Sequence, residues 1–292
     1  MIDLHTHSII SDGTDKPAQI VELAWQAGLK AIALTDHDTT EGIAEAAKKA
    51  HQLGITFLAG CEISCRWSTG TMHLLVYFPT DRSDNDDTTS PLSTGPFADE
   101  LLKLQKDRIQ RNRLIIDRLI SLGLPITWEE VVQEANGGLI GRPHFAKVLV
   151  KNKAVANMTE AFELWLGKGR LAYIKKARLL PEEIIRLAHS SKGIVSLAHP
   201  YSLGADASGL ELAVRELASL GLSGIEAYYS TYSVRERLNL VEIAEKNGLI
   251  PTGGSDYHGD YKPDIKIGVG RGDLCVPESV LEELLEKGSQ RF

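Results

Sequence analysis

Histidines and carboxylates recur in this sequence beside short apolar runs, where they could act together as metal ligands. His5 and His7 follow the first apolar residues, and Asp12 lies in the Ser-Asp-Gly turn that comes next. Comparable positions later in the chain are held by His37, Glu62, His73, His199, Asp256 and His258. Imidazole nitrogens combined with carboxylate oxygens suit Mn²⁺, Fe²⁺ or Zn²⁺ better than Ca²⁺. The pattern therefore predicts a metal centre, with metal-dependent hydrolysis as its chemistry.

Apolar runs of strand length alternate with helical patterns in two parts of the chain. Strands are expected at 2–4, 31–35, 55–64, 72–78, 194–198, 224–228 and 250–252. Helices are expected between them at 17–27, 41–51 (with Thr40 as N-cap), 181–190, 209–220 and 233–246. This alternation is typical of a parallel β/α barrel, whose functional groups lie at the C-terminal ends of its strands. Most of the predicted ligands directly follow a strand, so they would meet at that end.

Residues 98–178 interrupt the alternation with helical patterns alone. Helices are expected from 98 to 123 and at 127–135, 143–151 and 158–166, with no strong strand among them. We therefore expect a barrel made of residues 1–97 and 179–292, into which residues 98–178 are inserted as a helical domain. The preceding stretch, 81–96, is rich in Asp, Ser, Thr and Pro and is expected to be a mobile loop.

The net charge of −7 is distributed unevenly along the chain. Residues 98–178 hold 15 Lys and Arg against 9 Asp and Glu, so the insertion is basic and the remainder is strongly acidic. A basic segment beside a metal centre favours an anionic substrate. An ordinary solvated helix surface would give the same excess, so charge alone leaves both interpretations open.

The composition is that of a globular protein. A chain of 292 residues can bury one large core, or one core and a small appendage. No apolar run approaches the ~20 residues needed to cross a membrane, and the N-terminus does not resemble a signal peptide. The three cysteines give no disulfide framework, and Cys61 and Cys65 are expected to be buried thiols rather than a zinc pair. The expected compartment is the cytoplasm.

Taken together, these residues resemble the PHP (polymerase and histidinol phosphatase) family. The resemblance is carried by His5-Thr6-His7, Ser11-Asp12-Gly13, Thr35-Asp36-His37, Gly60-Cys61-Glu62, His199-Pro200 and Gly254-Ser255-Asp256-Tyr257-His258. It implies a distorted seven-stranded β/α barrel, similar to a TIM barrel, with a two- or three-metal centre. The helical insertion would then cap the substrate.

The resemblance also implies how the ligands are shared. One metal would be held by His5, His7, Glu62 and Asp256, a second by Asp12, His37 and His258, and a third by the bridging Glu62 with His73 and His199. The family most often uses Mn²⁺, with Fe²⁺ or Zn²⁺ as alternatives. Divalent ions lower the pKa of a bound water, so metal-bound hydroxide is expected to attack phosphorus.

A Gly-Arg-Pro-His sequence in the insertion gives a narrower indication. Arg142 could clamp a phosphate, and His144 could bind another oxygen or act as a general acid. Taken alone, the spacing is also typical of an ordinary helix start. The sequence in a helical insertion is similar to the PHP subfamily that removes the 3′-phosphate from 3′,5′-nucleotide bisphosphates. Tyr201 is a further candidate for substrate contact.

Members of that subfamily also act as 5′→3′ exonucleases on short RNA or DNA, which would fit the basic insertion. The expected partner is thus a small nucleotide or a short single strand, with no membrane and no obligate protein partner. Two alternatives remain at this point. One is a phosphomonoesterase resembling histidinol phosphatase, and the other is a non-enzymatic module associated with a polymerase.

Overall fold

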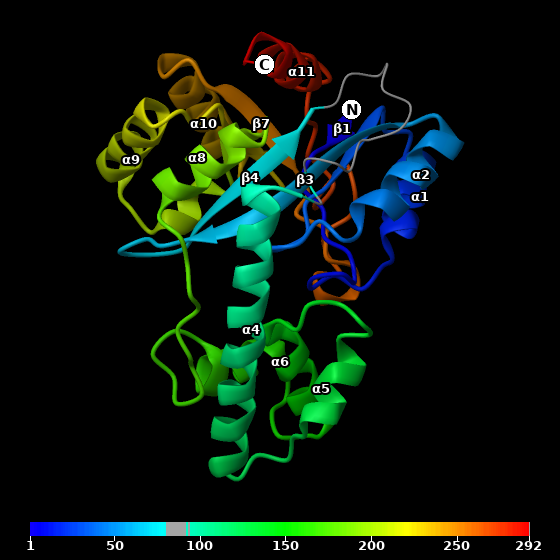
Figure 1. The fold of residues 1–292 in the computed structure, drawn as a ribbon, viewed down its shortest axis with the longest axis vertical. Helices are drawn as coiled ribbons and strands as arrows, with labels where there is room; N and C mark the ends of the chain where they lie inside the picture. Colours follow the sequence, from blue (N-terminus) through cyan, green and yellow to red (C-terminus); the bar gives the residue numbers. More distant parts are fainter. Residues whose placement is uncertain (80–91, 93, 292) are drawn as a thin grey trace.

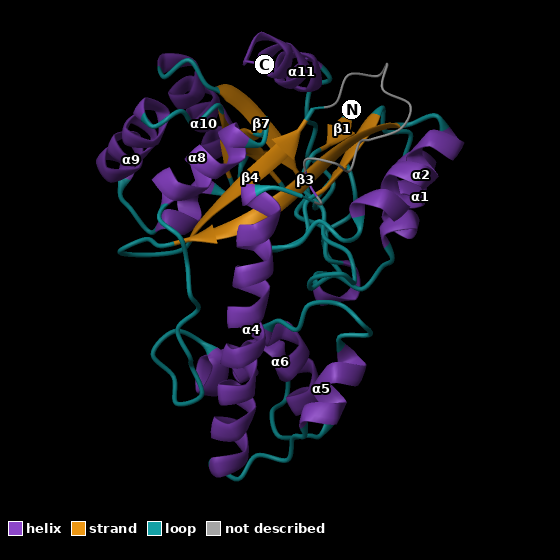
Figure 2. Ribbon diagram, viewed as in Figure 1, coloured by secondary structure: helices purple, strands orange, loops and turns teal. Residues whose placement is uncertain are grey.

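The computed structural model describes residues 1–79, 92 and 94–291, and its centre is one seven-stranded sheet (Figures 1 and 2). The strands follow one another in chain order: β1 Ile2–Asp3, β2 Ala31–Leu34, β3 Thr56–Cys65, β4 Met72–Phe78, β5 Ile194–Leu197, β6 Gly224–Tyr229 and β7 Ile250–Gly254. The first and last strands meet, because the Leu4 N–H donates to the Gly253 carbonyl at 3.2 Å. The predicted distorted seven-stranded α/β barrel is therefore confirmed.

The expectation of a uniformly parallel barrel is wrong at β4, which runs antiparallel to both β3 and β5. Only residues 66–71 join β3 to β4, and a link of that length can close a hairpin but cannot make a parallel crossover. The reversal brings the beginning of β4 to the end of the barrel where the parallel strands finish. His73, which lies early on its strand, is thereby placed among residues that follow theirs.

Helices cover the outside of the sheet, each burying one apolar face. They are α1 Pro17–Gln26, α2 Ile43–Leu53, α8 Pro181–Ser190, α9 Ala207–Ser219, α10 Val234–Lys246 and α11 Ser279–Arg291. In α1 the buried side chains include Ile20, Val21 and Ala24, at the spacing of one helix face. Thr40 does not cap α2 as expected: Gly42 holds that position, and the Thr40 hydroxyl donates to the Leu92 carbonyl. The C-terminal α11 was not predicted.

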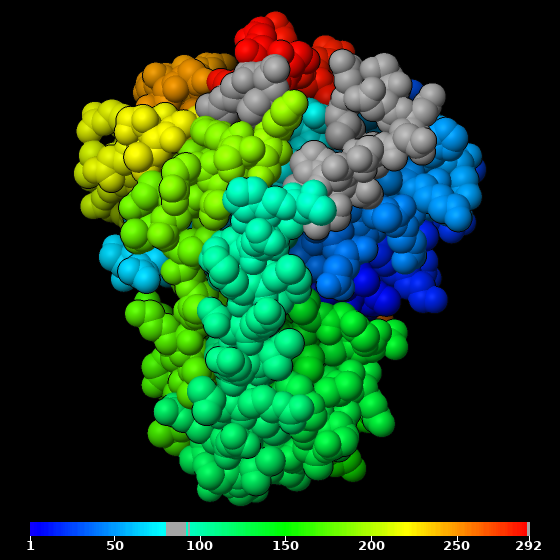
Figure 3. Space-filling model, viewed as in Figure 1, coloured from blue at the N-terminus to red at the C-terminus, as the bar shows by residue number. Residues whose placement is uncertain are grey.

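The insertion is helical as expected and forms a separate lobe below the barrel (Figure 3). Its helices are α4 Pro96–Ser121, α5 Trp128–Glu134, α6 Arg142–Lys151 and α7 Met158–Ala161, and a π-helical turn continues α7 over Phe162–Leu166. The insertion has an apolar cluster of its own, running along the chain from Ile115 to Ala172. The division at 98–178 stays a prediction. Most of the loop predicted at 81–96 lies outside the described residues, but its last residue, Pro96, already belongs to α4.

Helix α4 belongs to both cores. Leu101 and Leu104 are buried in the larger of the two apolar clusters of the barrel, whereas Ile115 and Leu119 are buried in that of the insertion. At 1.5 Å per residue its 26 residues span about 39 Å, and Figure 1 shows the helix running from the barrel through the length of the lower lobe. No helix of the described residues is both long enough and apolar enough to cross a membrane.

Candidate metal centre

The backbone of strands β1 and β7 continues past the sheet and carries four of the predicted ligands to one point. The Asp256 N–H donates to the His5 carbonyl at 2.8 Å, and the His7 N–H donates to the Tyr257 carbonyl at 2.9 Å. Asp256 adopts a left-handed backbone conformation, with φ 55°. A non-glycine residue held in that region is strained, and such strain is common at functional sites. The turn aims the Asp256 side chain back at His5 and His7.

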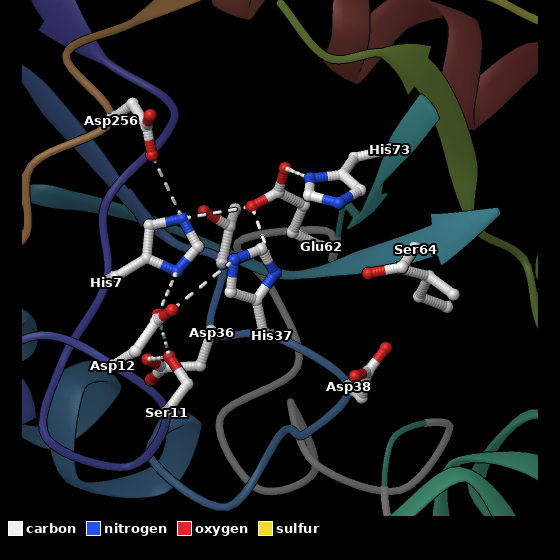
Figure 4. A network of polar contacts seen from close by, with 12 residues as sticks. His7, Ser11, Asp12, Asp36, His37, Asp38, Glu62, Ser64, His73 and Asp256 are labelled. Atoms are coloured by element: carbon white, nitrogen blue, oxygen red, sulfur yellow. Dashed lines mark hydrogen bonds and ion pairs between the residues drawn. The ribbon is translucent and has the colours of Figure 1, made fainter. Parts of the chain in front are cut away.

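The first group of side chains comprises His5, His7, Glu62 and Asp256, all of them buried. His7 Nε2 lies 3.1 Å from Glu62 Oε2 and 3.3 Å from Asp256 Oδ1. His5 Nε2 lies 3.1 Å from His7 Nε2 and 3.2 Å from the same Glu62 oxygen. Four ligand atoms thus face one small volume, as Figure 4 shows for three of these residues.

A second group consists of His7, Asp12, His37 and His258. The two carboxylate oxygens of Asp12 face different histidines of this group. Asp12 Oδ1 lies 3.4 Å from His258 Nε2. Asp12 Oδ2 lies 3.8 Å from His37 Nε2 (Figure 4). His7 therefore faces both the first and the second group through its two ring nitrogens. The sequence resemblance implied it for the first group alone.

The third group forms around the other oxygen of Glu62. His73 Nδ1 lies 2.7 Å from Glu62 Oε1, and His199 Nε2 lies 2.9 Å from the same atom. The ligand atoms of His37, Glu62 and His73 also lie close together, although His37 Nδ1 approaches the other oxygen, Glu62 Oε2, at 3.2 Å. All nine residues predicted as ligands are thus brought together, and Glu62 lies at their centre with one oxygen turned to each side.

Several ring nitrogens of this cluster are oriented as if towards a cation. The buried Nδ1 atoms of His7 and His37 have no hydrogen-bond partner among the residues that the structure describes. Burial lowers the pKa of His37 to about 3, so its ring is neutral and can offer a lone pair. Burial also disfavours charge on His7, but hydrogen bonds to Asp256 and Glu62 raise the pKa of His7 to about 9. A divalent ion would take the place of that proton, so the donor set fits a metal.

Two further carboxylates support the cluster, and the one with more contacts, Glu226, was not predicted from the sequence. Glu226 is fully buried on β6; its Oε1 lies 2.8 Å from His5 Nδ1, and its Oε2 accepts the His199 N–H at 2.7 Å. Asp36 accepts hydrogen bonds from the Ser8 and Ser11 hydroxyls and so fixes the loop that carries Asp12. A glutamate inside the apolar strand sequence Gly-Ile-Glu-Ala was the available signal for Glu226.

A cavity of about 140 Å³ lies between the cluster and the insertion. Asp12, His37 and His73 line it on the barrel side. The opposite side is lined by five cationic side chains, Arg108, Arg111, Arg142, Lys176 and Arg178. We call this cavity the arginine pocket. Basic residues from α4, from the start of α6 and from the segment returning to the barrel thus converge beside the predicted metal ligands.

The charges of the arginine pocket are only partly balanced. Asp38, which is buried, pairs with both Arg108 and Lys176. Within the described residues, Arg111, Arg142 and Arg178 make no ion pair with a carboxylate. Burial and the neighbouring Arg108 lower the pKa of Arg111 to about 9. Burying a charge without a partner is costly, so this surplus favours binding of an anion.

The similarities to known proteins agree with this geometry. Residues 3–115 match the model of the PHP domain. A 5′-3′ exoribonuclease, Rnm, from Salmonella typhimurium is 31% identical over 280 residues, which cover 95% of this chain and 90% of the relative. A 3′,5′-nucleoside bisphosphate phosphatase from Chromobacterium violaceum is 30% identical over 258 residues, with 88% and 87% covered. This chain belongs to the PHP family.

A solved structure from Bifidobacterium adolescentis, described as a metal-dependent phosphoesterase, superimposes with a TM-score of 0.82 at 28% identity. It covers 98% of this chain and 96% of its own. The two proteins therefore share their fold along almost the whole chain, in the insertion as well as in the barrel. The sequence-based prediction of a PHP phosphoesterase, a hydrolase of phosphoric esters, is confirmed.

The three residues predicted to contact substrate occupy different positions relative to the arginine pocket of this PHP protein. Arg142 lines it, with Nη1 donating to the Leu166 carbonyl at 3.1 Å. His144 is buried behind the helix start, and its Nδ1 accepts the Gly141 N–H at 2.9 Å. Tyr201 instead lines a wider cleft of about 840 Å³, which shares Asp12, His37 and His73 with the arginine pocket. Arg111 and Arg178 were not singled out from the sequence.

Proposed function

We propose that this protein removes the 3′-phosphate from 3′,5′-nucleotide bisphosphates, giving 5′-nucleotides. The observation that carries the proposal is the arginine pocket, which shares Asp12, His37 and His73 with the ligand cluster. A substrate with two phosphates on one ribose could place the 3′-phosphate at the cluster and the 5′-phosphate among the guanidinium groups. The Chromobacterium violaceum relative is named for this activity.

We further propose that two or three divalent ions, most suitably Mn²⁺, bind the nine clustered His, Asp and Glu side chains, with Fe²⁺ and Zn²⁺ as alternatives. When bound, such ions supply a water of lowered pKa and neutralise charge on the phosphate. The remaining tasks fall to the chain. Arg111, Arg142 and Arg178 would orient the substrate through its second phosphate, because guanidinium groups bind phosphate oxygens in pairs.

His144 is our candidate for the general acid. Its Nδ1 accepts the Gly141 N–H, so the neutral ring carries its hydrogen on Nε2. Burial lowers the pKa of His144 to about 4, although the charge of Asp12 opposes this shift. An anionic substrate in the arginine pocket, which the neighbouring Pro143 lines, would raise that pKa and favour the protonated form. In the absence of substrate the residue is a hydrogen-bond donor without charge.

A second candidate activity is exonucleolytic cleavage of short RNA or DNA from the 5′ end, as the name of the Salmonella typhimurium relative suggests. The wide cleft that opens onto the cluster favours it, because aromatic side chains there could stack on the base of a leaving nucleotide. They include Tyr201, Tyr229 and Tyr232. A simple phosphomonoesterase is less consistent with the site, since a single phosphate at the cluster would leave the arginine pocket without its anion.

The test measures how the Arg142→Ala variant hydrolyses two different substrates. We expect kcat/KM for a 3′,5′-bisphosphate to fall about 10- to 150-fold, the effect of losing one charge-assisted contact, while an aryl phosphate is affected only slightly. Arg170→Ala, an exposed arginine elsewhere on the insertion, is the matched control and should change neither rate. Equal losses for both substrates would mean that Arg142 serves the phosphate at the cluster or the fold, and the proposed role would be abandoned.

A further inference from the structure

A third cavity, larger than the arginine pocket, continues from that pocket away from the ligand cluster. Its volume is about 630 Å³, and none of the nine predicted metal ligands lines it. Its wall in common with the arginine pocket consists of Thr71, Arg142, Tyr173, Lys176 and Arg178. Residues found only in the larger cavity include Arg66, Trp67, Lys168 and Lys175. We call this cavity the basic groove.

Two segments far apart in the sequence form the basic groove. One is the hairpin turn between β3 and β4, and the other is the segment by which the insertion returns to the barrel; both lie on the same side of α4 (Figure 1). They are joined where Lys168 Nζ donates to the Thr69 carbonyl at 2.9 Å. Trp67 is fixed at the wall, because its Nε1 donates to the Leu203 carbonyl at 3.2 Å.

The lining of the basic groove is strongly cationic. Six of its residues are Arg or Lys, and no carboxylate of the described chain lines it. Arg178 faces both cavities, and its buried Nε finds no hydrogen-bond partner within the described chain. In the part of the chain that the structure describes, the side chains of Arg66 and Lys175 make no ion pair. A wall of this kind favours a ligand with several negative charges.

We propose that the basic groove binds a further phosphoryl group attached to the 5′-phosphate of the substrate, so that nucleoside 5′-diphosphate 3′-monophosphates are also substrates. This inference rests on the proposed function, because it takes the arginine pocket as the site of the 5′-phosphate. Anything beyond that pocket and away from the cluster must then be attached to that phosphate. Water attacks the 3′-phosphorus, the bond from phosphorus to O3′ breaks, and O3′ takes a proton. The products are a nucleoside 5′-diphosphate and inorganic phosphate.

The first experiment measures binding rather than turnover. Adenosine 5′-diphosphate and adenosine 5′-monophosphate are titrated calorimetrically into the metal-loaded protein. We expect the diphosphate to bind about five- to thirtyfold more tightly, the range for two partly exposed charge contacts. The double variant Arg66→Gln/Lys175→Gln should lose this preference and keep its affinity for the monophosphate. Lys106→Gln/Lys151→Gln removes the same charge from exposed positions elsewhere on the insertion, and it should leave the preference intact.

The second experiment measures kcat/KM for the 3′,5′-bisphosphate and for the 5′-diphosphate 3′-monophosphate of the same nucleoside. The groove variant should lower kcat/KM about five- to thirtyfold for the second substrate and less than about twofold for the first. Equal affinity of the wild type for the two adenosine nucleotides, or equal losses for both substrates in the variant, would overturn the inference and leave bisphosphate hydrolysis standing. If the wild type fails to hydrolyse the bisphosphate, the proposed function itself is wrong.

Discussion

Glu226 supports two of the predicted metal ligands at once, so replacing it with Gln is a sharp test of how the cluster is held. Its Oε1 lies 2.8 Å from the His5 ring, and its Oε2 accepts the His199 N–H at 2.7 Å. A glutamine has a single acceptor oxygen, so only one of these contacts can persist. The amide nitrogen must then face another donor, and a buried group loses its partner.

The expected magnitude follows from these contacts. Loss of one hydrogen bond to a charged group costs about 1.5–3 kcal/mol, which corresponds to about 10- to 150-fold in an equilibrium constant. Residues that orient metal ligands typically change metal affinity about 10- to 100-fold when they are replaced. We therefore expect Glu226→Gln to weaken binding of the ion nearest His5 by about 10- to 100-fold.

The assay is competition for Zn²⁺ or Mn²⁺ between the protein and a chromophoric chelator, with a thermal melt to show that the metal-free variant is folded. Because Glu226 is not among the residues lining the cavities beside the cluster, excess metal should restore most of the activity. Glu242→Gln, an exposed glutamate paired with Lys246, is the control. Metal affinity within about threefold of wild type would refute the reasoning, since the carboxylate would then not orient its neighbours.

Three shorter predictions concern other parts of the site. Burial lowers the pKa of Lys176 to about 8, so affinity for adenosine 5′-monophosphate should fall as the pH rises through about 8; Lys176→Arg should flatten this decline in a binding titration. Gly138→Ala would place a Cβ atom 1.7 Å from the Ile9 carbonyl oxygen, so a thermal melt should show the free energy of unfolding reduced by about 1–3 kcal/mol. An unchanged Tm would contradict that contact. Asp256→Ala should abolish phosphoesterase activity while circular dichroism still shows a folded protein, and undiminished turnover would exclude Asp256 from the reaction.

The cluster could be predicted from the sequence because each ligand is a local feature. His5, His37 and His199 all follow a short apolar run. The C-terminal ends of parallel strands lie at the same end of a barrel, whatever the order of the strands around it. The prediction therefore did not require knowing which strand neighbours which. The one strand whose direction was wrongly expected, β4, still delivered His73 correctly, because its reversal put the beginning of that strand at the same end.

The arginine pocket was harder to predict, because it depends on contacts between distant parts of the chain. Asp38 pairs with Arg108, 70 residues away, and with Lys176, 138 residues away. In the sequence Arg108 and Arg111 are two of several cations on an amphipathic helix, and nothing local separates them from those that face solvent. The Gly-Arg-Pro-His sequence identified Arg142 only because it resembled a known pattern. The excess charge of residues 98–178 indicated an anion, and the fold was needed to locate it.

Helix α4 has a mechanical consequence for how this enzyme admits its substrate. Lids that close over active sites are usually tethered by loops, and they swing about a few hinge residues. Here the segment carrying Arg108 and Arg111 is a continuous helix, anchored at one end by Leu101 and Leu104 in the barrel and at the other by the core of the insertion. A rotation of the lobe as a rigid body would have to bend that helix or unpack one of the two cores. The two arginines are therefore held in position before any ligand arrives, and little of the binding energy needs to be spent on ordering them.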